Sequence, residues 1–293
     1  MKLQTLVDIP PSKRKIGVGD TILTIGSCFS DEIGAKMQEY LLDAVSNPFG
    51  TLYNPLSIAQ AINYPIPETD GQIPLVEYDG LWHSMAHHGA FSRRTREEAE
   101  EAVRASVETM QRAIEKASVI IITFGTAWVY EGIGDKLKVI GEKIVGNCHK
   151  MPGEWFSRRR LTVEEIVTAW GPILDRYPDK HWIFTVSPIR HAKDGFHENQ
   201  LSKATLLMAI EQLCTEYRIQ STDRISYFPS YEIQLDELRD YRFYADDLVH
   251  PSSLAVEYIW ERFVDTFFTP QDKNELIKRH KEWKFSQHKP HYV

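Results

Sequence analysis

The order of the expected strands and helices constrains the fold of this chain more than any other feature. Four short runs rich in β-branched residues have the length and the flanking residues of buried strands: residues 21–25, 118–124, 182–187 and 225–228. Longer segments of helical periodicity lie between and after them, at 95–116, 162–176, 199–218 and after His250. Strands that alternate with helices pair in parallel, because parallel strands need long crossover connections. The sequence therefore predicts an α/β fold, a three-layer α/β/α sandwich with a mainly parallel, doubly wound sheet.

Nothing in the 293 residues divides the chain into separate domains. No linker, low-complexity stretch or internal repeat interrupts the alternation, so one domain over residues 1–293 is expected. Residues 63–96, rich in Pro, Gly and His, break the periodicity and predict a long surface excursion. A second insertion at about 137–146 has Gly141-Glu142 between two apolar runs, which predicts a β-hairpin.

Composition excludes several classes of partner. The chain carries 34 basic and 41 acidic residues, and this net charge of -7 argues against nucleic acid, whose phosphates are bound by Lys and Arg. The one compact basic run, residues 158–160, is interpreted as solvated surface. Neither a signal-peptide core nor ~18 consecutive apolar residues occur, so we expect no membrane partner and a cytoplasmic location. The three cysteines are too few for a disulfide framework and predict reduced thiols.

The turn Gly26-Ser27-Cys28-Phe29 is the first candidate for chemistry. It follows the first strand directly, and Phe29, Ile33 and Met37 then recur at a spacing of four, as on one face of a helix. A helix N-terminus offers free N–H groups and a positive field to an anion, and it lowers the pKa of a thiol placed there. The alternative is that three small residues merely permit a tight turn and that Cys28 is a buried, inert thiol.

A second candidate element lies far along the chain, in Asp247-Leu248-Val249-His250-Pro251. An aspartate and a histidine three residues apart on a turn can touch. The carboxylate would fix the imidazole tautomer while the other ring nitrogen takes a proton from a nucleophile. Taken alone, His250 could be a surface histidine and Asp247 a helix cap. Together with the Ser-Cys turn, they predict a catalytic triad.

Several motifs together make the chain resemble the GSCFA family of the SGNH (GDSL-like) hydrolases. Besides Gly26-Ser27-Cys28-Phe29-Ser30 and Asp247 to Pro251, the resemblance rests on these segments: Asn47-Pro48-Phe49-Gly50, Tyr53-Asn54-Pro55, Phe124-Gly125-Thr126-Ala127-Trp128, Asn147-Cys148-His149-Lys150 and Ser187-Pro188-Ile189-Arg190-His191. It covers most of the sequence. The resemblance implies an SGNH-like hydrolase fold and a deacylase of acylated carbohydrate or of a similar small ester.

Overlaying the family motifs assigns roles to individual residues. SGNH enzymes have Gly-Asp-Ser at the first motif, so the overlay implies Cys28 as nucleophile and puts Ser27 in place of the aspartate. The Ser27 hydroxyl is the alternative nucleophile, and because consecutive residues at a strand end point to opposite sides, we expect only one of the two to face His250. Gly50 falls beside the oxyanion glycine of the second motif. Gly125-Thr126-Ala127 falls on Gly-x-Asn, which puts Ala127 where the oxyanion asparagine should be. Loss of one oxyanion donor costs ~10²- to 10³-fold in rate.

Other residues can complete the site. Asn147 is a candidate substitute for the missing asparagine, or else a residue that ends the predicted hairpin. The loop after the third strand carries Arg190 and His191, which could line a substrate pocket. Arg190 suits a carboxylate or phosphate, or else it forms an ion pair with Asp194.

Three hypotheses follow from these residues. The first is an acyl-ester hydrolase or acyl transferase that acts on a small-molecule ester or an acylated carbohydrate through Cys28, His250 and Asp247. The second is a non-catalytic binding module on the same scaffold. The third, a metal-dependent hydrolase, is disfavoured because Cys28, Cys148, His149, His87 and His88 lack ligand spacing. Phosphate-binding glycine motifs are also missing, so we expect neither a metal nor a cofactor.

Overall fold

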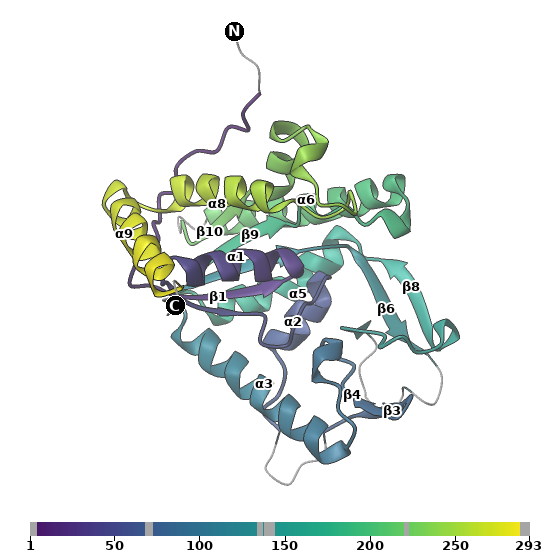
Figure 1. The fold of residues 1–293 in the computed structure, drawn as a ribbon. Coiled ribbons are helices and arrows are strands. Elements are labelled where there is room, and N and C mark those ends of the chain that lie inside the picture. The colour runs from purple at the N-terminus through teal and green to yellow at the C-terminus, as the bar shows by residue number, and fades with distance from the viewer. Residues whose placement is uncertain (1–4, 68–72, 134–136, 138–143, 220–222, 288–293) are drawn as a thin grey trace, which may run out of the picture.

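The computed structural model describes residues 5–67, 73–133, 137, 144–219 and 223–287, and a five-stranded parallel sheet forms its centre (Figure 1). The strands, in spatial order, are β2 (Asp43–Ser46), β1 (Thr21–Gly26), β5 (Val119–Phe124), β9 (His181–Val186) and β10 (Ile225–Phe228). All four predicted strands are therefore present and pair in parallel, as expected. β2 was not predicted because it is a short, half-exposed edge strand without a continuous apolar run.

Helices cover both faces of this sheet. α1 (Cys28–Glu39) and α8 (Ser253–Phe267) share a buried cluster with Ile22 and Ile121, and α9 (Pro270–Gln287) adds Leu276 to it. The opposite face, which includes Leu23 and Ile122, belongs to a second cluster with four further helices. These helices are α2 (Pro55–Ile62), α3 (Arg96–Lys116), α5 (Val163–Arg176) and α6 (Phe196–Ile219). The predicted three-layer α/β/α sandwich is confirmed.

Side-chain caps explain where the predicted helices begin. Thr95 caps α3, and Ser252 caps α8. Thr162 and Glu165 form a reciprocal capping box at the start of α5, which satisfies two backbone donors that the helix leaves unpaired. Helices α2 and α9 were not predicted; α2 spans eight residues, too few to display a clear helical period.

Two small antiparallel sheets lie on one side of the molecule, at the right of Figure 1. One pairs β3 (Val76–Tyr78) with β4 (Leu81–His83), and the other has the order β7-β6-β8, with β6 (Trp128–Gly132), β7 (Ile144–Val145) and β8 (Phe156–Arg160). Residues 138–143 of the predicted hairpin lie outside the described residues, and β7 pairs with β6. The 63–96 segment contributes buried side chains as well as surface, among them Met85 and His87.

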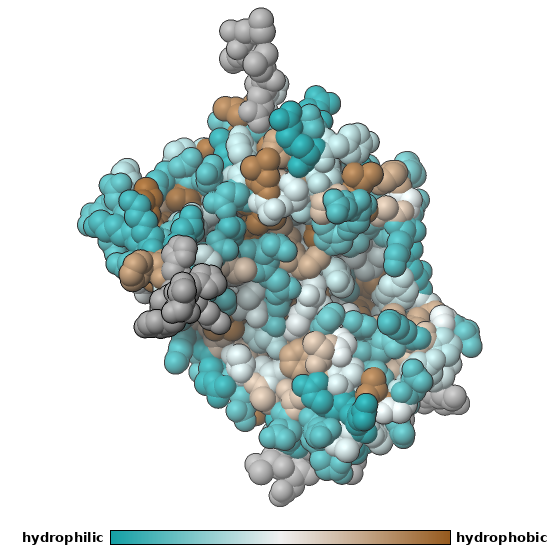
Figure 2. All heavy atoms as spheres, viewed as in Figure 1, coloured by the Kyte–Doolittle hydropathy of each residue, from teal (hydrophilic) through white to brown (hydrophobic). Residues whose placement is uncertain are grey.

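Short helical turns complete the described chain: η1 (Gly89–Phe91), η2 (Gly153–Trp155), η3 (Ala192–Asp194), α7 (Ser230–Glu232), η4 (Ile233–Glu237) and η5 (Tyr241–Phe243). On the face shown in Figure 2, strongly hydrophobic residues are scattered among hydrophilic ones. The residues of the basic run form ion pairs with acidic neighbours: Arg158 with Asp194, Arg159 with Glu131 and Glu165, and Arg160 with Glu198. Among the described helices, none is both long and apolar enough to cross a membrane.

Candidate active site

The candidate site is built where β1, β5 and β9 end at the same edge of the sheet. Ser27, Gly125 and Ser187 are each the first residue past their strand. Backbone hydrogen bonds continue between these residues and the strands, from Ser27 N to Thr123 O at 3.1 Å and from Ser187 N to Phe124 O at 2.8 Å. Ligands of open α/β sheets bind beyond this carboxyl edge, so the turn at Ser27 lies where a site is expected.

Gly26 is required by the geometry of the turn before α1. Its φ is 147°, and a Cβ added there would lie 2.1 Å from the Thr123 carbonyl oxygen, so no other residue fits without moving the sheet. Asn47, in the loop after β2, accepts a hydrogen bond from Gly26 N at 2.8 Å and donates one to Asp31 at 2.7 Å. Asn47 thereby ties β1 to the first turn of α1. The sequence interpretation did not assign it this role.

Ser27 and Cys28 occupy different environments. Ser27 is only 1% exposed, lies against Gly125, and its Oγ has no hydrogen-bond partner among the described residues. Cys28 is half-buried, its thiol is free, and it is the first residue of α1. Only Cys28 is open to a substrate without movement of the turn.

The thiol of Cys28 is not acidified as the sequence interpretation expected. Burial raises its pKa, and the carboxylates of Asp31 and Glu32 raise it further. The backbone N–H groups of Cys28 and Phe29 approach the sulfur and oppose this rise, as expected at a helix N-terminus. The desolvation cost is the larger effect, so the expectation of a lowered thiol pKa is wrong for the free protein.

Asp247 and His250 touch as the sequence predicts. Their Oδ2 and Nδ1 atoms lie 2.6 Å apart, and the other carboxylate oxygen accepts the N–H groups of Val249 and His250, both at 2.9 Å. These three bonds hold the pKa of Asp247 down at about 2, with the backbone N–H groups as the largest cause. The pair is open to solvent, with side chains 50% and 48% exposed. Asp247 therefore fixes the imidazole orientation and leaves Nε2 facing away from the carboxylate.

Arg190 anchors the loop that carries this pair. Its guanidinium donates to the Leu248 carbonyl and its backbone N–H donates to the Val249 carbonyl at 3.2 Å. The guanidinium also lies over the rings of Tyr244 and Phe196. Asp194 pairs with Arg158, so the alternative of an Arg190–Asp194 ion pair is wrong. Arg190 thus joins the end of β9 to the Asp247–His250 loop.

His191 is the second residue of this segment that lines the site. Its ring meets that of Tyr53 edge to face at 6.3 Å, and its backbone N–H donates to the Asn199 side chain at 3.0 Å. Burial lowers the pKa of His191 to about 4, and the charges of Lys203 and His250 lower it further. His191 is therefore neutral at pH 7, and it brings the β9 loop near both Gly125 and His250.

The backbone amides of Gly50, expected to hold an oxyanion, and of the candidate residues Gly125 and Thr126 already donate elsewhere. The N–H groups of Gly125 and Thr126 both donate to the Tyr53 carbonyl, at 2.8 and 2.9 Å, and Gly50 N donates to Asn47 O at 2.7 Å. Cys28, as the first residue of α1, has an amide without an intrahelical acceptor. The amide of Cys28 is thus the best-placed donor for an oxyanion.

Asn147 has a turn geometry in this structure. Its Oδ1 accepts the N–H of His149 at 2.8 Å, two residues ahead, and its own N–H reaches the Met85 carbonyl at 3.3 Å. Within the described part of the chain, no contact joins Asn147 to Cys28 or His250. The geometry favours the turn interpretation over the oxyanion interpretation.

Lys203 is a buried charged residue near the site that the sequence interpretation missed. It lies on α6 and is 1% exposed, and its Nζ donates to the carbonyls of Gly125 and Ser187 at 2.7 and 2.8 Å. The sequence held one clue. Lys203 falls in register with Leu206, Ile210 and Leu213 on the apolar face of the helix, where a lysine is out of place.

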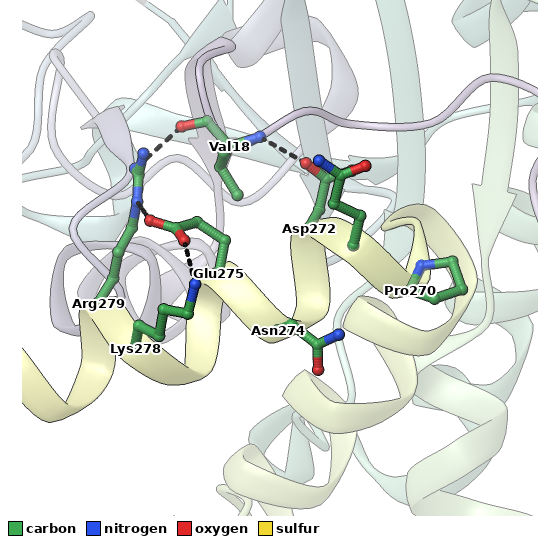
Figure 3. A pocket seen from close by; sticks show the side chains of 8 residues that line it. Val18, Pro270, Asp272, Asn274, Glu275, Lys278 and Arg279 are labelled. Atoms are coloured by element: carbon green, nitrogen blue, oxygen red, sulfur yellow. Dashed lines mark hydrogen bonds and ion pairs between the residues drawn. The ribbon is translucent and has the colours of Figure 1, made fainter.

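In the part of the chain that the structure describes, the predicted site coincides neither with a cluster of metal ligands nor with the cavity drawn in Figure 3. No group of three or more metal-ligating side chains occurs among the described residues. A cavity of about 700 Å³ lies elsewhere, between Val18 and the start of α9 (Figure 3). There Arg279 donates to the Val18 carbonyl and pairs with Glu275, which also binds Lys278. This cavity includes no residue of the predicted site, so we assign it a structural role.

Comparison with known proteins gives one family. The model of the GSCFA family matches residues 21–263. No curated protein matches the sequence. A family two carbohydrate esterase from Clostridium thermocellum, solved with cellohexaose, aligns at 12% identity with a TM-score of 0.39, over 95% of this chain and 67% of its own. An acetyl xylan esterase from Butyrivibrio proteoclasticus aligns at 12% identity with a TM-score of 0.40, over 88% of this chain and 64% of its own.

Proposed function

The chain belongs to the GSCFA family, and from this premise we propose that it is an acyl-ester hydrolase working through a covalent acyl-enzyme at Cys28. The observation that supports this most is the 2.6 Å contact between His250 Nδ1 and Asp247 Oδ2, on a loop that Arg190 joins to the end of β9. A histidine oriented in this way can accept and return a proton at Nε2.

The proposed reaction has two steps that balance. In the first, Cys28 Sγ attacks the ester carbonyl while His250 Nε2 takes the thiol proton. The C–O bond then breaks, and the alcohol leaves with that proton, which forms a thioester on Cys28. In the second, water loses a proton to His250 and attacks the thioester. The C–S bond breaks, the sulfur regains the proton, and the carboxylic acid is released.

The N-terminus of α1 supplies the electrostatic part of this proposal. Negative charge that develops on the carbonyl oxygen would be stabilised by the amide of Cys28 and by the positive field of the helix. The N–H groups of Cys28 and Phe29 already approach the sulfur and favour its thiolate form. They offset part of the cost of burying that anion.

We propose a small ester or an acylated carbohydrate as the substrate class. Asp247 and His250 are half exposed, so the acceptor side of the reaction is open to water or to another hydroxyl compound. An acyl transferase on the same scaffold would use the same first step and replace water in the second. The ratio of free acid to transferred ester, measured with added alcohols, separates hydrolysis from transfer.

Turnover of a short-chain aryl ester tests the proposal. Cys28→Ala and His250→Ala should each reduce turnover by about 10³-fold or more, as loss of a nucleophile or its base does. Cys148→Ala is the matched control, because it removes a second half-buried thiol outside the proposed machinery, and it should retain activity. Unchanged turnover in both Cys28→Ala and His250→Ala would contradict the proposal.

A second candidate function is ligand binding without catalysis. It is favoured by the occupied amides of Gly125 and Thr126 and by Ala127, which is fully buried where the resemblance implies an oxyanion asparagine. This alternative predicts saturable binding of an acylated sugar by calorimetry with no released acid. Detection of stoichiometric or greater acid release that depends on Cys28 would reject it.

A further inference from the structure

Lys203 places its amino group at the carboxyl ends of β5 and β9, the edge of the sheet that carries the proposed site. Its Nζ donates to Gly125 O at 2.7 Å and to Ser187 O at 2.8 Å, so one group bridges the residues that follow β5 and β9. The side chain comes from α6, which packs against β9 and β10, and it is 1% exposed. No solvent-exposed lysine could span the two strand ends in this way.

The surroundings of Lys203 hold no neutralising carboxylate among the residues that the structure describes. The Tyr231 ring lies 5.3 Å from Nζ, and the Cys28 thiol on α1 and the His191 imidazole from the β9 loop are close enough to interact with its charge. Burial lowers the pKa of Lys203 to about 7, while the negative form of Cys28 raises it. An ammonium at Lys203 therefore favours the thiolate of Cys28, although burial and the carboxylates of Asp31 and Glu32 act on that thiol more strongly.

One of the two carbonyls that Lys203 binds belongs to Gly125, a residue that packs directly against the Ser27–Cys28 turn. Gly125 lies against Ser27, and a Cβ added at Gly125 would be 3.3 Å from Ser27 Cβ and 3.0 Å from the Tyr53 carbonyl oxygen. That same Tyr53 carbonyl receives the amides of Gly125 and Thr126. The peptide group between Gly125 and Thr126 is therefore held at its N–H by the Tyr53 carbonyl and at its C=O by the ammonium of Lys203.

We propose that Lys203 is a positioning residue of the site, whose buried ammonium ties the ends of β5 and β9 together and stabilises the anion formed at Cys28. The inference rests on the proposed function in assigning a reactive anion to Cys28. It explains why a charge that has no carboxylate partner among the described residues is kept in the core. The cost of burying it would otherwise favour an apolar residue on this helix face.

The first test is alkylation of Cys28 by iodoacetamide, followed by peptide mass spectrometry, which requires no turnover. Lys203→Met should slow alkylation about tenfold near pH 6, because removal of a nearby charge shifts a pKa by about one unit. The deficit should shrink above the Lys203 pKa of about 7, where the wild-type amine is itself neutral. Lys203→Arg should recover part of the rate near pH 6, since arginine keeps the charge.

Lys180→Met is the matched control. Lys180 is also buried and donates to a backbone carbonyl, that of Glu115 at 2.8 Å, but it lies just before β9, at the opposite edge of the sheet. The Lys180→Met variant should have a lower free energy of unfolding and the same pH dependence of Cys28 alkylation as the wild type. Equal alkylation profiles in folded Lys203→Met and wild type would overturn the inference, and so would the same change in Lys180→Met.

A second measurement needs no variant at Lys203. Wild-type protein is alkylated at Cys28 with iodoacetate, which leaves a fixed negative charge, or with iodoacetamide, which leaves a neutral group of similar size. The lysine side chain of lowest pKa, followed by carbon NMR, should titrate about one unit higher in the charged adduct. Coincident titrations would overturn the inference. A protein that fails to turn over esters would count against the proposed function. The alkylation rates and the NMR titration would still test the role of Lys203, because neither requires turnover.

Discussion

The two sides of the site are held in contrasting ways. The turn at Cys28 is enclosed by the sheet, with Gly26 against Thr123, Asn47 bound to both β1 and Asp31, and Ser27 buried. The Asp247–His250 pair stands on a half-exposed loop and is ordered by its own local hydrogen bonds. The contrast suggests that the proposed nucleophile, Cys28, is positioned by the fold itself, whereas the proposed base, His250, depends on a few separable contacts.

This difference in burial also determines how readily each side of the site carries a negative charge. Cys28 sits where burial and nearby carboxylates disfavour its anion. Asp247 sits where water and three N–H groups favour its anion. Substitutions on the turn side should therefore affect stability and activity together, while those on the loop side should affect activity alone.

The largest expected effect is from Gly26→Ala. The new Cβ would meet the Thr123 carbonyl in a backbone conformation that L-residues rarely adopt, and we expect a loss of about 3 kcal/mol or more in the free energy of unfolding. Urea denaturation measures it. Gly153→Ala is the control, because a Cβ there meets open space, and it should change stability by less than about 0.5 kcal/mol. Equal stability of the two variants would show that the turn side is not rigid.

Asp247→Asn should have the next largest effect, on rate only. The amide cannot stabilise an imidazolium at Nδ1 and can favour the wrong tautomer, so kcat should fall by about 10³-fold. The melting temperature should stay near that of the wild type, because the side chain is half exposed. A large fall in melting temperature would mean that the loop contributes to the core and that the contrast is wrong.

Arg190→Gln should have a smaller effect on the same side. Loss of the bond to the Leu248 carbonyl and of the ring contacts should let the loop move, and we expect about a tenfold fall in kcat/KM, in the range that misplacement of a catalytic group produces. Arg112→Gln, on the exposed face of α3, is the control. A rate equal to that of the control would show that the loop does not need this anchor.

The smallest expected effects come from pH, and they fall at opposite ends of the scale for the two sides. The pKa of Asp247 is depressed in the folded state to about 2, so its contribution to loop order is present above the unfolded pKa of roughly 3.9 and is lost as pH falls through about 2. The pKa of Cys28 is raised, so its alkylation by iodoacetamide should keep becoming faster on the alkaline side as thiolate forms. An alkylation rate that levels off near pH 7 would show that burial does not raise the pKa of this thiol.

Local sequence patterns were sufficient for much of the fold. The four strands and the helices beginning at Thr95, Thr162 and Ser252 follow from β-branched runs, helical periods and caps. The contact between Asp247 and His250 was predictable because three residues on a turn bring the side chains together. Each of these features depends on neighbours in the sequence.

The missed features depend on contacts between distant segments. The Lys203 bridge joins α6 to residues that lie 78 and 16 positions away. The occupied amides of Gly125 and Thr126 depend on the position of the Tyr53 carbonyl, and the raised pKa of Cys28 depends on how deeply the turn is buried. A sequence pattern can name such residues as candidates, but their partners are set only by tertiary packing.

Identification of the acylated residue shows whether Cys28 is the nucleophile. A slowly hydrolysed aryl ester is mixed with the protein, the reaction is quenched in acid, and the acyl group is located by peptide mass spectrometry. We expect one acyl group on Cys28, which neutral hydroxylamine removes as expected for a thioester. An acyl group on Ser27, or turnover that never acylates Cys28, would contradict it.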